Sequence, residues 1–506
     1  MLAKIKSSAV IGLDAIPIDV EVDVASQGLP SFTIVGLPDK AVEESKERVR
    51  SAIKNSGAEF PAKRITVNLA PADIPKEGPS YDLPIALGIL TASGQIEADF
   101  SDAIFLGELS LNGDLRRVAG VLPQAILARD KKLKSIFIPK DNSQEATVVG
   151  GIGVFGVESL LELFKHLKGE VLFEKEIFRE VEISQLDDDY EFDFKDIKGQ
   201  EFAKRALEIA AAGSHNVFLT GPPGAGKTLL SRALPSILPT LTFEEALEVT
   251  KIYSVAGLLK DGQPLIRRRS FRAPHNTASQ VGLIGGGQHP KPGEISLSHK
   301  GVLFLDEIPL FGPATLEALR QPMEDGFITV SRARGMVTYP ASFMLVCASN
   351  PCPCGFLGDP RKECRCTSRE ISRYQKRLSG PFLDRIDLFV EVPSLKIQKL
   401  EGEEAEPSVK IRTRVQKARD RQTERFKERK ISANAEMSSR DIKEFVDLDP
   451  GAKKLLQQAG HKLDLSARGY SRVLRVGQTI ADLFGESKIE ARHIAEAVQY
   501  RQRLGD

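Results

Sequence analysis

The chain has 506 residues, of which 41% are hydrophobic and 27% are charged, and its formal net charge is +1. This length predicts two or three domains, because single hydrophobic cores stop growing at about 250–300 residues. Apolar runs such as Leu83 to Leu90 are far shorter than the roughly 20 residues that span a bilayer, and Asp14 interrupts the stretch that faintly resembles a signal peptide. We therefore expect a globular, cytoplasmic protein without a membrane segment.

The first 170 residues mix strand and helix patterns. Every second residue from Ile16 to Val24 is apolar, which is the period of a half-buried strand. Residues 40–56 place apolar side chains at helical spacing, and Gly57 stands where a helix would end. A short strand over 65–69 and a helix over 82–93 follow. The pattern predicts an α+β domain over residues 1–170.

Acidic residues accumulate from Asp187 to Asp196, and such a composition predicts an exposed linker over residues 171–194. Beyond it, short apolar runs at 216–220, 302–305 and 343–348 are separated by helical segments. This alternation is typical of a parallel sheet covered on both faces, so we predict an α/β core over residues 195–400.

A second break, at 401–407, opens a helical segment that we interpret as a lid domain over residues 401–506. From Pro407 to Asp506 the chain has 22 Lys or Arg against 14 Asp or Glu, so this part is basic. A basic surface suits a polyanion, and it equally suits an ordinary solvated helical surface.

The strongest motif lies between the runs at 216–220 and 302–305. A strand that ends in a glycine-rich loop and continues into a helix lets backbone N–H groups surround phosphates. The predicted ATP-binding loop consists of Gly221, Pro222, Pro223, Gly224, Ala225, Gly226, Lys227 and Thr228. Lys227 is expected to reach the β and γ phosphates, and Thr228 to ligate Mg²⁺.

Asp306 and Glu307 end the apolar run 302–305, where the carboxyl edge of a parallel sheet binds ligands. We expect Asp306 to hold Mg²⁺ and Glu307 to orient the attacking water. The motif is only moderately specific alone, but it is strong beside the phosphate loop.

Four segments together resemble the magnesium-chelatase-like AAA+ ATPases of the ComM/YifB family: residues 221–228, Arg-Ala-Pro-His at 272–275, Pro-Gly-Glu-Ile-Ser at 292–296, and 301–307. The resemblance covers nearly the whole chain. It implies an α/β protein with a Lon-protease-like α+β N-terminal domain, an AAA+ P-loop core and a C-terminal helical lid. It also implies a homohexameric ring that works on single-stranded or branched DNA.

That resemblance implies an ATP hydrolase acting as a DNA helicase, which promotes branch migration in homologous recombination of DNA taken up in natural transformation. Two alternatives remain open: a magnesium-chelatase motor subunit and a protein-remodelling AAA+ ATPase.

The resemblance also assigns further catalytic residues. Asn350 corresponds to the family's sensor asparagine, and Arg385 to the arginine finger that reaches the neighbouring subunit's γ-phosphate. Arg468 corresponds to the lid's sensor arginine, although Arg472, one helical turn further on, competes for that role. Without the resemblance, each arginine would more often form a surface ion pair.

Two segments are predicted to contact DNA. The Gly- and Pro-rich residues 282–293 are expected to form an inserted loop or hairpin, and 327–340 a second hairpin. In similar motors such hairpins line the ring pore, so Lys291, Arg332 and Arg334 would contact phosphates without reading sequence. An ordinary solvated turn is the competing interpretation.

Four cysteines lie close together in the sequence: Cys352, Cys354, Cys364 and Cys366. Four thiolates at this compact spacing suit tetrahedral zinc, although the pairs are Cys-x-Cys where Cys-x-x-Cys is commoner. The alternative is a set of reduced cysteines in a loop near the sensor. Cys347 lies within an apolar run and is expected in the core.

Ser80 falls on the serine position of Lon-like proteases. The lysine that would activate it is expected in residues 119–124, which read Ala-Gly-Val-Leu-Pro-Gln. A serine hydroxyl without a base is a poor nucleophile, so we predict a Lon-like fold without proteolysis.

Overall fold

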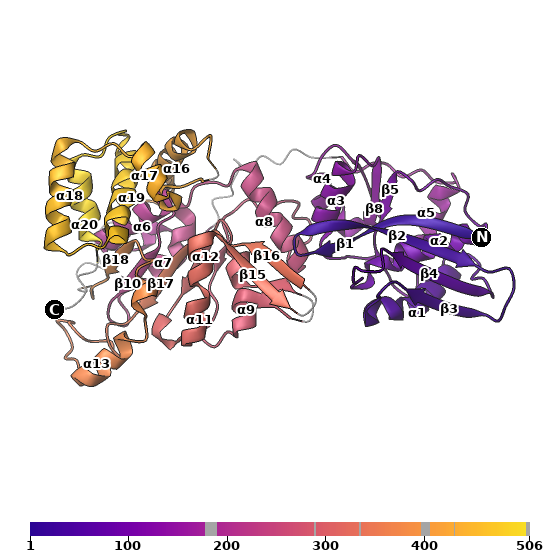
Figure 1. Ribbon diagram of the computed structural model, residues 1–506, viewed down its shortest axis with the longest axis horizontal. Helices are drawn as coiled ribbons and strands as arrows, with labels where there is room; N and C mark the ends of the chain where they lie inside the picture. Colours follow the sequence, from indigo (N-terminus) through magenta and orange to yellow (C-terminus); the bar gives the residue numbers. More distant parts are fainter. Residues whose placement is uncertain (178–189, 288–289, 333–334, 396–404, 430, 502–506) are drawn as a thin grey trace. The chain divides into compact units, whose positions relative to one another are not determined.

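The computed structural model describes residues 1–177, 190–287, 290–332, 335–395, 405–429 and 431–501. The chain forms two compact units. We call residues Met1–Glu182 with Phe243–Ile266 the N-terminal unit, and Ile183–Thr242 with Arg267–Asp506 the motor unit. Both mix helices and strands (Figure 1), as expected of an α/β protein.

The N-terminal unit contains a four-stranded sheet in the order β1-β2-β4-β3. Strands β1 and β2 form an antiparallel hairpin, and β3 runs parallel to β4. A second, parallel sheet has the order β5-β8-β9. The strands are β1 (Leu2–Ile11), β2 (Asp14–Val24), β3 (Ser31–Val35), β4 (Arg64–Ala70), β5 (Ala103–Phe105), β6 (Glu108–Leu109), β7 (Leu115–Arg116), β8 (Ser135–Pro139) and β9 (Gly153–Val157).

The helices of this unit are α1 (Lys40–Asn55), α2 (Asp82–Ala92), α3 (Val121–Asp130), α4 (Ser143–Thr147) and α5 (Leu160–Leu167). Helix α1 buries the face predicted from its spacing, and the side chain of Asp39 caps its first turn. Helix α2 is apolar on every side and is almost entirely buried. Ser80 lies in the 3₁₀ turn Pro79–Tyr81 that precedes α2.

Residues 243–266 follow the phosphate loop in the chain but belong to the N-terminal unit. Helix α8 (Phe243–Ala256) packs on α3. The hydroxyl of Ser254 donates to Glu145 over 2.9 Å, and the carbonyl of Ser254 accepts from the amide of Gly120 at 2.9 Å. The chain therefore passes between the two units at 182–183, 242–243 and 266–267.

The motor unit is built on a five-stranded parallel sheet with the order β11-β14-β17-β10-β18. The strands are β10 (Val217–Thr220), β11 (Phe271–Arg272), β14 (Val302–Leu305), β17 (Met344–Ser349) and β18 (Leu388–Glu391). β10, first in the chain, lies between the last two strands, so strand order reverses around it. Ligands bind beyond the carboxyl ends of strands at such a reversal.

The helices around this sheet include α6 (Glu201–Gly213), α7 (Lys227–Ala233), α10 (Glu294–Leu297), α11 (Pro313–Ala318), α12 (Arg320–Asp325), α13 (Ser368–Gln375) and α14 (Gly380–Leu383). Antiparallel strand pairs occupy both segments, 282–293, where a loop or hairpin was predicted, and 327–340, where a hairpin was predicted. A short helix, α9 (Gln280–Ile284), leads into β12 (Gly285–Gly286), which pairs with β13 (Lys291–Pro292). The longer hairpin joins β15 (Phe327–Arg332) to β16 (Gly335–Pro340).

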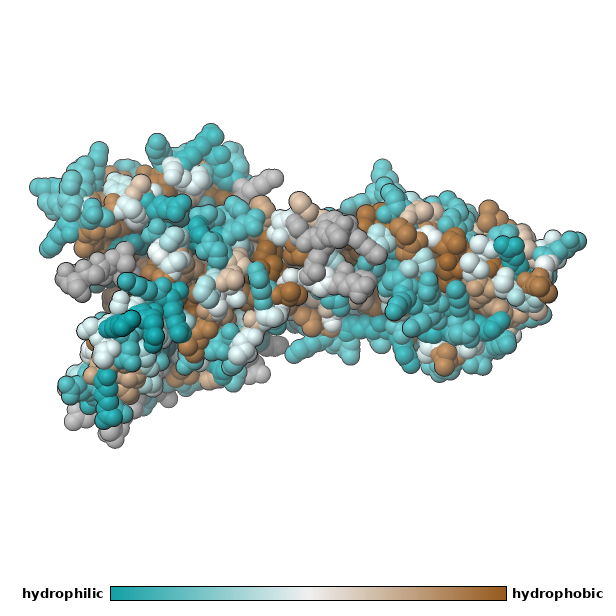
Figure 2. Space-filling view, turned by 60° about the horizontal axis from the view of Figure 1, so that its bottom comes forward, coloured by the Kyte–Doolittle hydropathy of each residue, from teal (hydrophilic) through white to brown (hydrophobic). Residues whose placement is uncertain are grey.

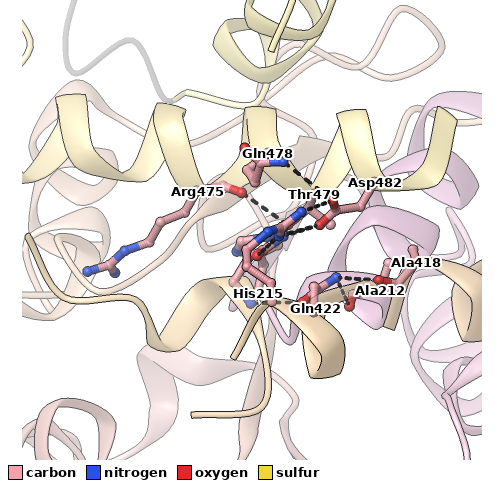
Figure 3. A network of polar contacts seen from close by, with 10 residues as sticks. Ala212, His215, Ala418, Gln422, Arg475, Gln478, Thr479 and Asp482 are labelled. Carbon is pink, nitrogen blue, oxygen red and sulfur yellow. Dashed lines mark hydrogen bonds and ion pairs between the residues drawn. The ribbon is translucent and has the colours of Figure 1, made fainter. Parts of the chain in front are cut away.

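The C-terminal helices are α16 (Ser408–Arg425), α17 (Ser439–Phe445), α18 (Pro450–Lys462), α19 (Ala467–Phe484) and α20 (Ala491–Gln499). Helices α16 and α19 pack against α6, and a buried polar network joins these three (Figure 3). His215 lies 2.7 Å from the hydroxyl of Thr479, and the amide of Gln422 donates to the carbonyl of Ala212 over 3.0 Å. These hydrogen bonds between α6, α16 and α19, and from the residues that follow α6, favour one arrangement of the packed helices.

Hydrophilic residues cover much of the face shown in Figure 2, and hydrophobic residues form separate patches on it. Among the described helices, none is both long and apolar enough to cross a membrane.

Candidate nucleotide site

The predicted phosphate loop connects β10 to α7. Gly224 and Gly226 have φ angles of +75° and +94°, which an L side chain rarely adopts, and both face open space. Gln200 supports the loop from outside, because its amide donates to the carbonyls of Ala225 (3.0 Å) and Pro393 (2.7 Å). The loop therefore has the open, backbone-lined shape that phosphate binding requires.

Lys227 opens α7 and is buried. Its ammonium donates to the carbonyls of Gly221 (2.7 Å) and Pro222 (2.9 Å) and to the side-chain oxygen of Asn350 (3.0 Å). Burial lowers the pKa of Lys227, although the nearby carboxylates of Asp306 and Glu307 favour its charged form. The ammonium thus lies against the first two residues of the phosphate loop and beside Asn350.

Sheet order explains why distant residues meet here. β17 lies between β10 and β14. Asn350 follows β17 and Asp306 follows β14, so both lie on the same side of the phosphate loop that follows β10. The hydroxyl of Thr228 donates to Asp306 over 2.9 Å. Glu307 is exposed and has a φ of 50°, in the sparsely populated left-handed region. This set fits ATP and Mg²⁺: two metal-binding oxygens in contact, one phosphate-binding ammonium, and a carboxylate open to solvent.

The two predicted arginines lie at the opposite edge of the sheet. Asn216 donates to the backbone carbonyl of Arg385 over 2.9 Å, which places Arg385 level with the start of β10. β10 separates it from the phosphate loop by four residues, or about 13 Å. Arg385 is buried and ion-paired with Glu324; Arg468 is exposed and lies 3.7 Å from the same carboxylate.

Glu324, Arg385 and Arg468 line a cleft of about 800 Å³ at the amino ends of the strands. The structure therefore brings the two predicted arginines together and holds both away from this chain's own phosphate loop.

Arg472, the alternative lid arginine, is buried and lies 3.7 Å from Asp387. Asp387 also lies 3.6 Å from His215. Burial alone would raise the pKa of Asp387, but the neighbouring His215 and the charges of Arg472 and Arg475 outweigh it and lower that pKa. Arg468 and Arg472 both line the cleft, but Arg472 is buried beside a carboxylate that it neutralises, whereas Arg468 is exposed.

Two of the predicted DNA-contacting residues, Lys291 and Arg332, lie on strands of the two hairpins. Lys291 is exposed in β13. Arg332 is the last residue of β15, and Arg334 lies outside the described residues.

The four predicted metal ligands come together. The sulfur atoms of Cys352, Cys354, Cys364 and Cys366 all lie within 4.8 Å of one another, so they could hold a metal ion. Cys347 is fully buried in β17, as expected, and burial raises the pKa of its thiol.

Several residues of the site were not found from the sequence. Gln200 and Glu324 act through partners far away in the chain, and neither belongs to a motif. Arg272 and Glu294 do belong to two of the motifs that carried the resemblance, and they form a bidentate ion pair with two 2.6 Å contacts. The joint presence of these two motifs in the sequence was the only indication that Arg272 and Glu294 form an ion pair.

A parallel sheet of this order, with a phosphate loop beside an Asp–Glu pair and a following Asn, defines a P-loop ATPase core. One family model covers this core, and two further models match segments on either side of it. Those described as "Magnesium chelatase, subunit ChlI", "Subunit ChlI of Mg-chelatase" and "Magnesium chelatase, subunit ChlI C-terminal" match residues 193–400, 20–142 and 405–501.

Relatives that match almost the whole chain indicate which family of P-loop ATPases it belongs to. Competence protein ComM of Haemophilus influenzae is 45% identical over 507 residues, covering 99% of this chain and 97% of that protein. The YifB protein of Escherichia coli is 44% identical over 506 residues, with the same coverage. The magnesium-chelatase 67 kDa subunit of Chlorobaculum parvum is 29% identical over 162 residues, 31% of this chain and 23% of that protein. The chain belongs to the ComM/YifB family of magnesium-chelatase-like AAA+ proteins, and membership implies ATP and Mg²⁺ as ligands.

Proposed function

We propose that this protein is an ATP-driven DNA motor that works as a homohexameric ring in the cytoplasm and promotes branch migration during recombination of incoming DNA. The observation that carries the ring is the separation of Lys227 from Arg385 across the sheet. A site that needs both is completed only where the phosphate-loop edge of one copy meets the arginine edge of the next. Head-to-tail contacts of this kind close into rings.

In the proposed site, ATP supplies the phosphoryl group and Mg²⁺ offsets its charge. Lys227 and the loop amides bind the phosphates, while Thr228 and Asp306 hold the metal ion. Glu307 accepts a proton from, and orients, the attacking water, and Asn350 positions it. Arg385 and Arg468 of the adjacent copy stabilise charge on the γ-phosphate.

The DNA part of the proposal rests on the relation to a competence protein and on the position of the hairpins. β16 ends at Pro340, four residues before β17, and β17 ends beside Asn350. Movement at the nucleotide can therefore pass along β17 into β16 of the hairpin. The double variant Arg332→Ala/Arg334→Ala is expected to bind DNA more weakly and with a smaller dependence on salt, by about one unit of slope for each phosphate that is no longer neutralised. Unchanged affinity and slope in titrations at several salt concentrations would contradict the assignment.

Two other functions are weaker candidates. A chelatase motor is suggested by the family models, but the matched chelatase subunit covers 31% of this chain while the ComM relative covers 99%. An ATP-dependent protease requires a base for Ser80, which the sequence motif lacks. DNA-stimulated, porphyrin-dependent and peptide-releasing assays on the purified protein separate the three.

A further inference from the structure

The four clustered thiols have the dimensions of a site for one metal ion. The sulfur atom of Cys352 lies 3.4 Å from that of Cys354 and 3.6 Å from that of Cys364, and Cys354 and Cys364 are also 3.6 Å apart. The amide of Cys354 donates to the sulfur of Cys366 over 3.3 Å, which brings in the fourth thiol.

These separations discriminate between the possible occupants. A tetrahedral ion with Zn–S bonds of about 2.3 Å places its sulfur ligands about 3.8 Å apart. The observed separations are close to that value and far above the roughly 2.05 Å of a disulfide. Thiols this close together suit a single ion. Four thiolates favour zinc. In the same loop Asp359 and Glu363 oppose Arg361, Lys362 and Arg365, so nearby side chains offset little of the negative charge that such a site carries.

We call residues 352–366, which carry the four cysteines, the cysteine loop. This loop contacts the nucleotide site directly. It begins two residues after Asn350, whose side chain accepts from Lys227. A Cβ atom on Gly355 would lie 2.7 Å from the ring of Pro223 and 3.7 Å from the side chain of Asn350. The loop backbone therefore packs on the phosphate loop without space for one added carbon.

Helix α13 follows the cysteine loop, and its last residues contact the segment on either side of Asn350. Thr367 caps α13 directly after Cys366. Near the end of α13 the amide of Gln375 donates to the carbonyl of Pro351 over 3.3 Å, and the hydroxyl of Tyr374 lies 3.5 Å from that of Ser349. Both ends of the cysteine loop are thus held beside the sensor.

We propose that Cys352, Cys354, Cys364 and Cys366 bind one structural zinc ion, and that this zinc site holds Asn350 and the phosphate loop in the geometry that binds ATP. The second part rests on the ATPase function proposed above. Loss of zinc, by chelation or by thiol oxidation, would then lower ATP turnover while the rest of the fold persists.

The first test is the metal content of the full-length protein, purified under reducing conditions without chelators. We expect about one zinc ion per chain, lost in Cys364→Ser/Cys366→Ser and retained in the control Cys347→Ala, whose thiol lies outside the cluster. Visible absorption of tetrahedral Co²⁺–thiolate bonds after cobalt substitution would confirm the ligands. Wild-type protein without metal, or with iron in place of zinc, would overturn the proposal.

The second test measures how fast a mercurial reagent releases zinc into a colorimetric chelator, in the intact protein with and without a non-hydrolysable ATP analogue. Because the zinc site packs on the phosphate loop, the bound analogue should slow release on the order of tenfold. The Lys227→Ala variant should show no such protection. Equal release rates with and without the analogue would overturn the link to the nucleotide site. A protein that holds zinc but hydrolyses no ATP would instead refute the ATPase proposal and leave the metal site intact.

Discussion

If Arg385 acts on the neighbouring subunit, two inactive variants should restore activity to each other. Lys227→Ala removes the phosphate-binding ammonium, and Arg385→Ala removes the arginine finger, whose loss in related phosphoryl-transfer enzymes costs on the order of 10³-fold in turnover. At the amino edge of the sheet, Arg385 is separated from its own phosphate loop by the whole of β10, about 13 Å. Each homogeneous ring would therefore be inactive.

A ring assembled from equal amounts of the two variants has four kinds of interface. Only the interface that joins the phosphate loop of an Arg385→Ala copy to the arginine of a Lys227→Ala copy is complete, so about a quarter of interfaces become active. ATP hydrolysis should recover to roughly that fraction of the wild-type rate, provided that the copies are mixed before the rings assemble.

The matched control is a mixture of Lys227→Ala with Glu307→Gln. Both changes lie on the phosphate-loop edge, so no interface is complete and no activity should return. Failure of the first mixture to recover at any ratio, in rings that demonstrably contain both variants, would refute the assignment of Arg385 to the neighbour's site.

Two further predictions test individual contacts. Gly355→Ala and Gly358→Ala both place a side chain at a positive φ, at a cost of about 1–2 kcal/mol, but only the methyl group added at position 355 would collide with the phosphate loop. Fluorescent-nucleotide titrations should therefore show weaker ATP binding in the first variant alone, and equal binding in both would contradict the packing described. Asp387→Asn leaves Arg472 buried without its counter-charge, so the free energy of unfolding of the motor unit should fall by about 3–5 kcal/mol. Because the pKa of Asp387 is below its ordinary value, the stability it contributes is present above pH of about 4 and is lost on further acidification; a urea titration series from pH 3 to 6 on wild type and variant checks this sign.

The local parts of the fold could be predicted from the sequence, because their signal is periodic. The run at 302–305 coincides with β14, and the helix expected over 40–56 is α1, with Gly57 at a φ of +73° just beyond its end. Capping residues, apolar spacing and glycine positions are read from neighbours in the chain. The same holds for the phosphate loop, whose chemistry is contained in eight consecutive residues.

The parts that depend on sheet order could not be predicted in this way. Glu324 meets Arg385 and Arg468 only because the amino ends of the strands and the start of α19 border one cleft. The packing of α8 on α3 joins segments more than a hundred positions apart, and no pattern within 243–266 indicates it. The roles expected of Arg385 and Arg468 come from the family resemblance, whereas their ion pairs with Glu324 are seen only in the structure.

The central claim is that this ATPase works on DNA, and it is tested most directly by ATP hydrolysis of the purified full-length protein with single-stranded, duplex and four-way-junction DNA, and without DNA. The account predicts slow hydrolysis alone, strong stimulation by at least one of these DNAs, and no hydrolysis in Glu307→Gln under any condition. Hydrolysis that is abolished by Glu307→Gln but unaffected by every DNA would contradict the DNA motor, and would favour the chelatase or protein-remodelling alternative.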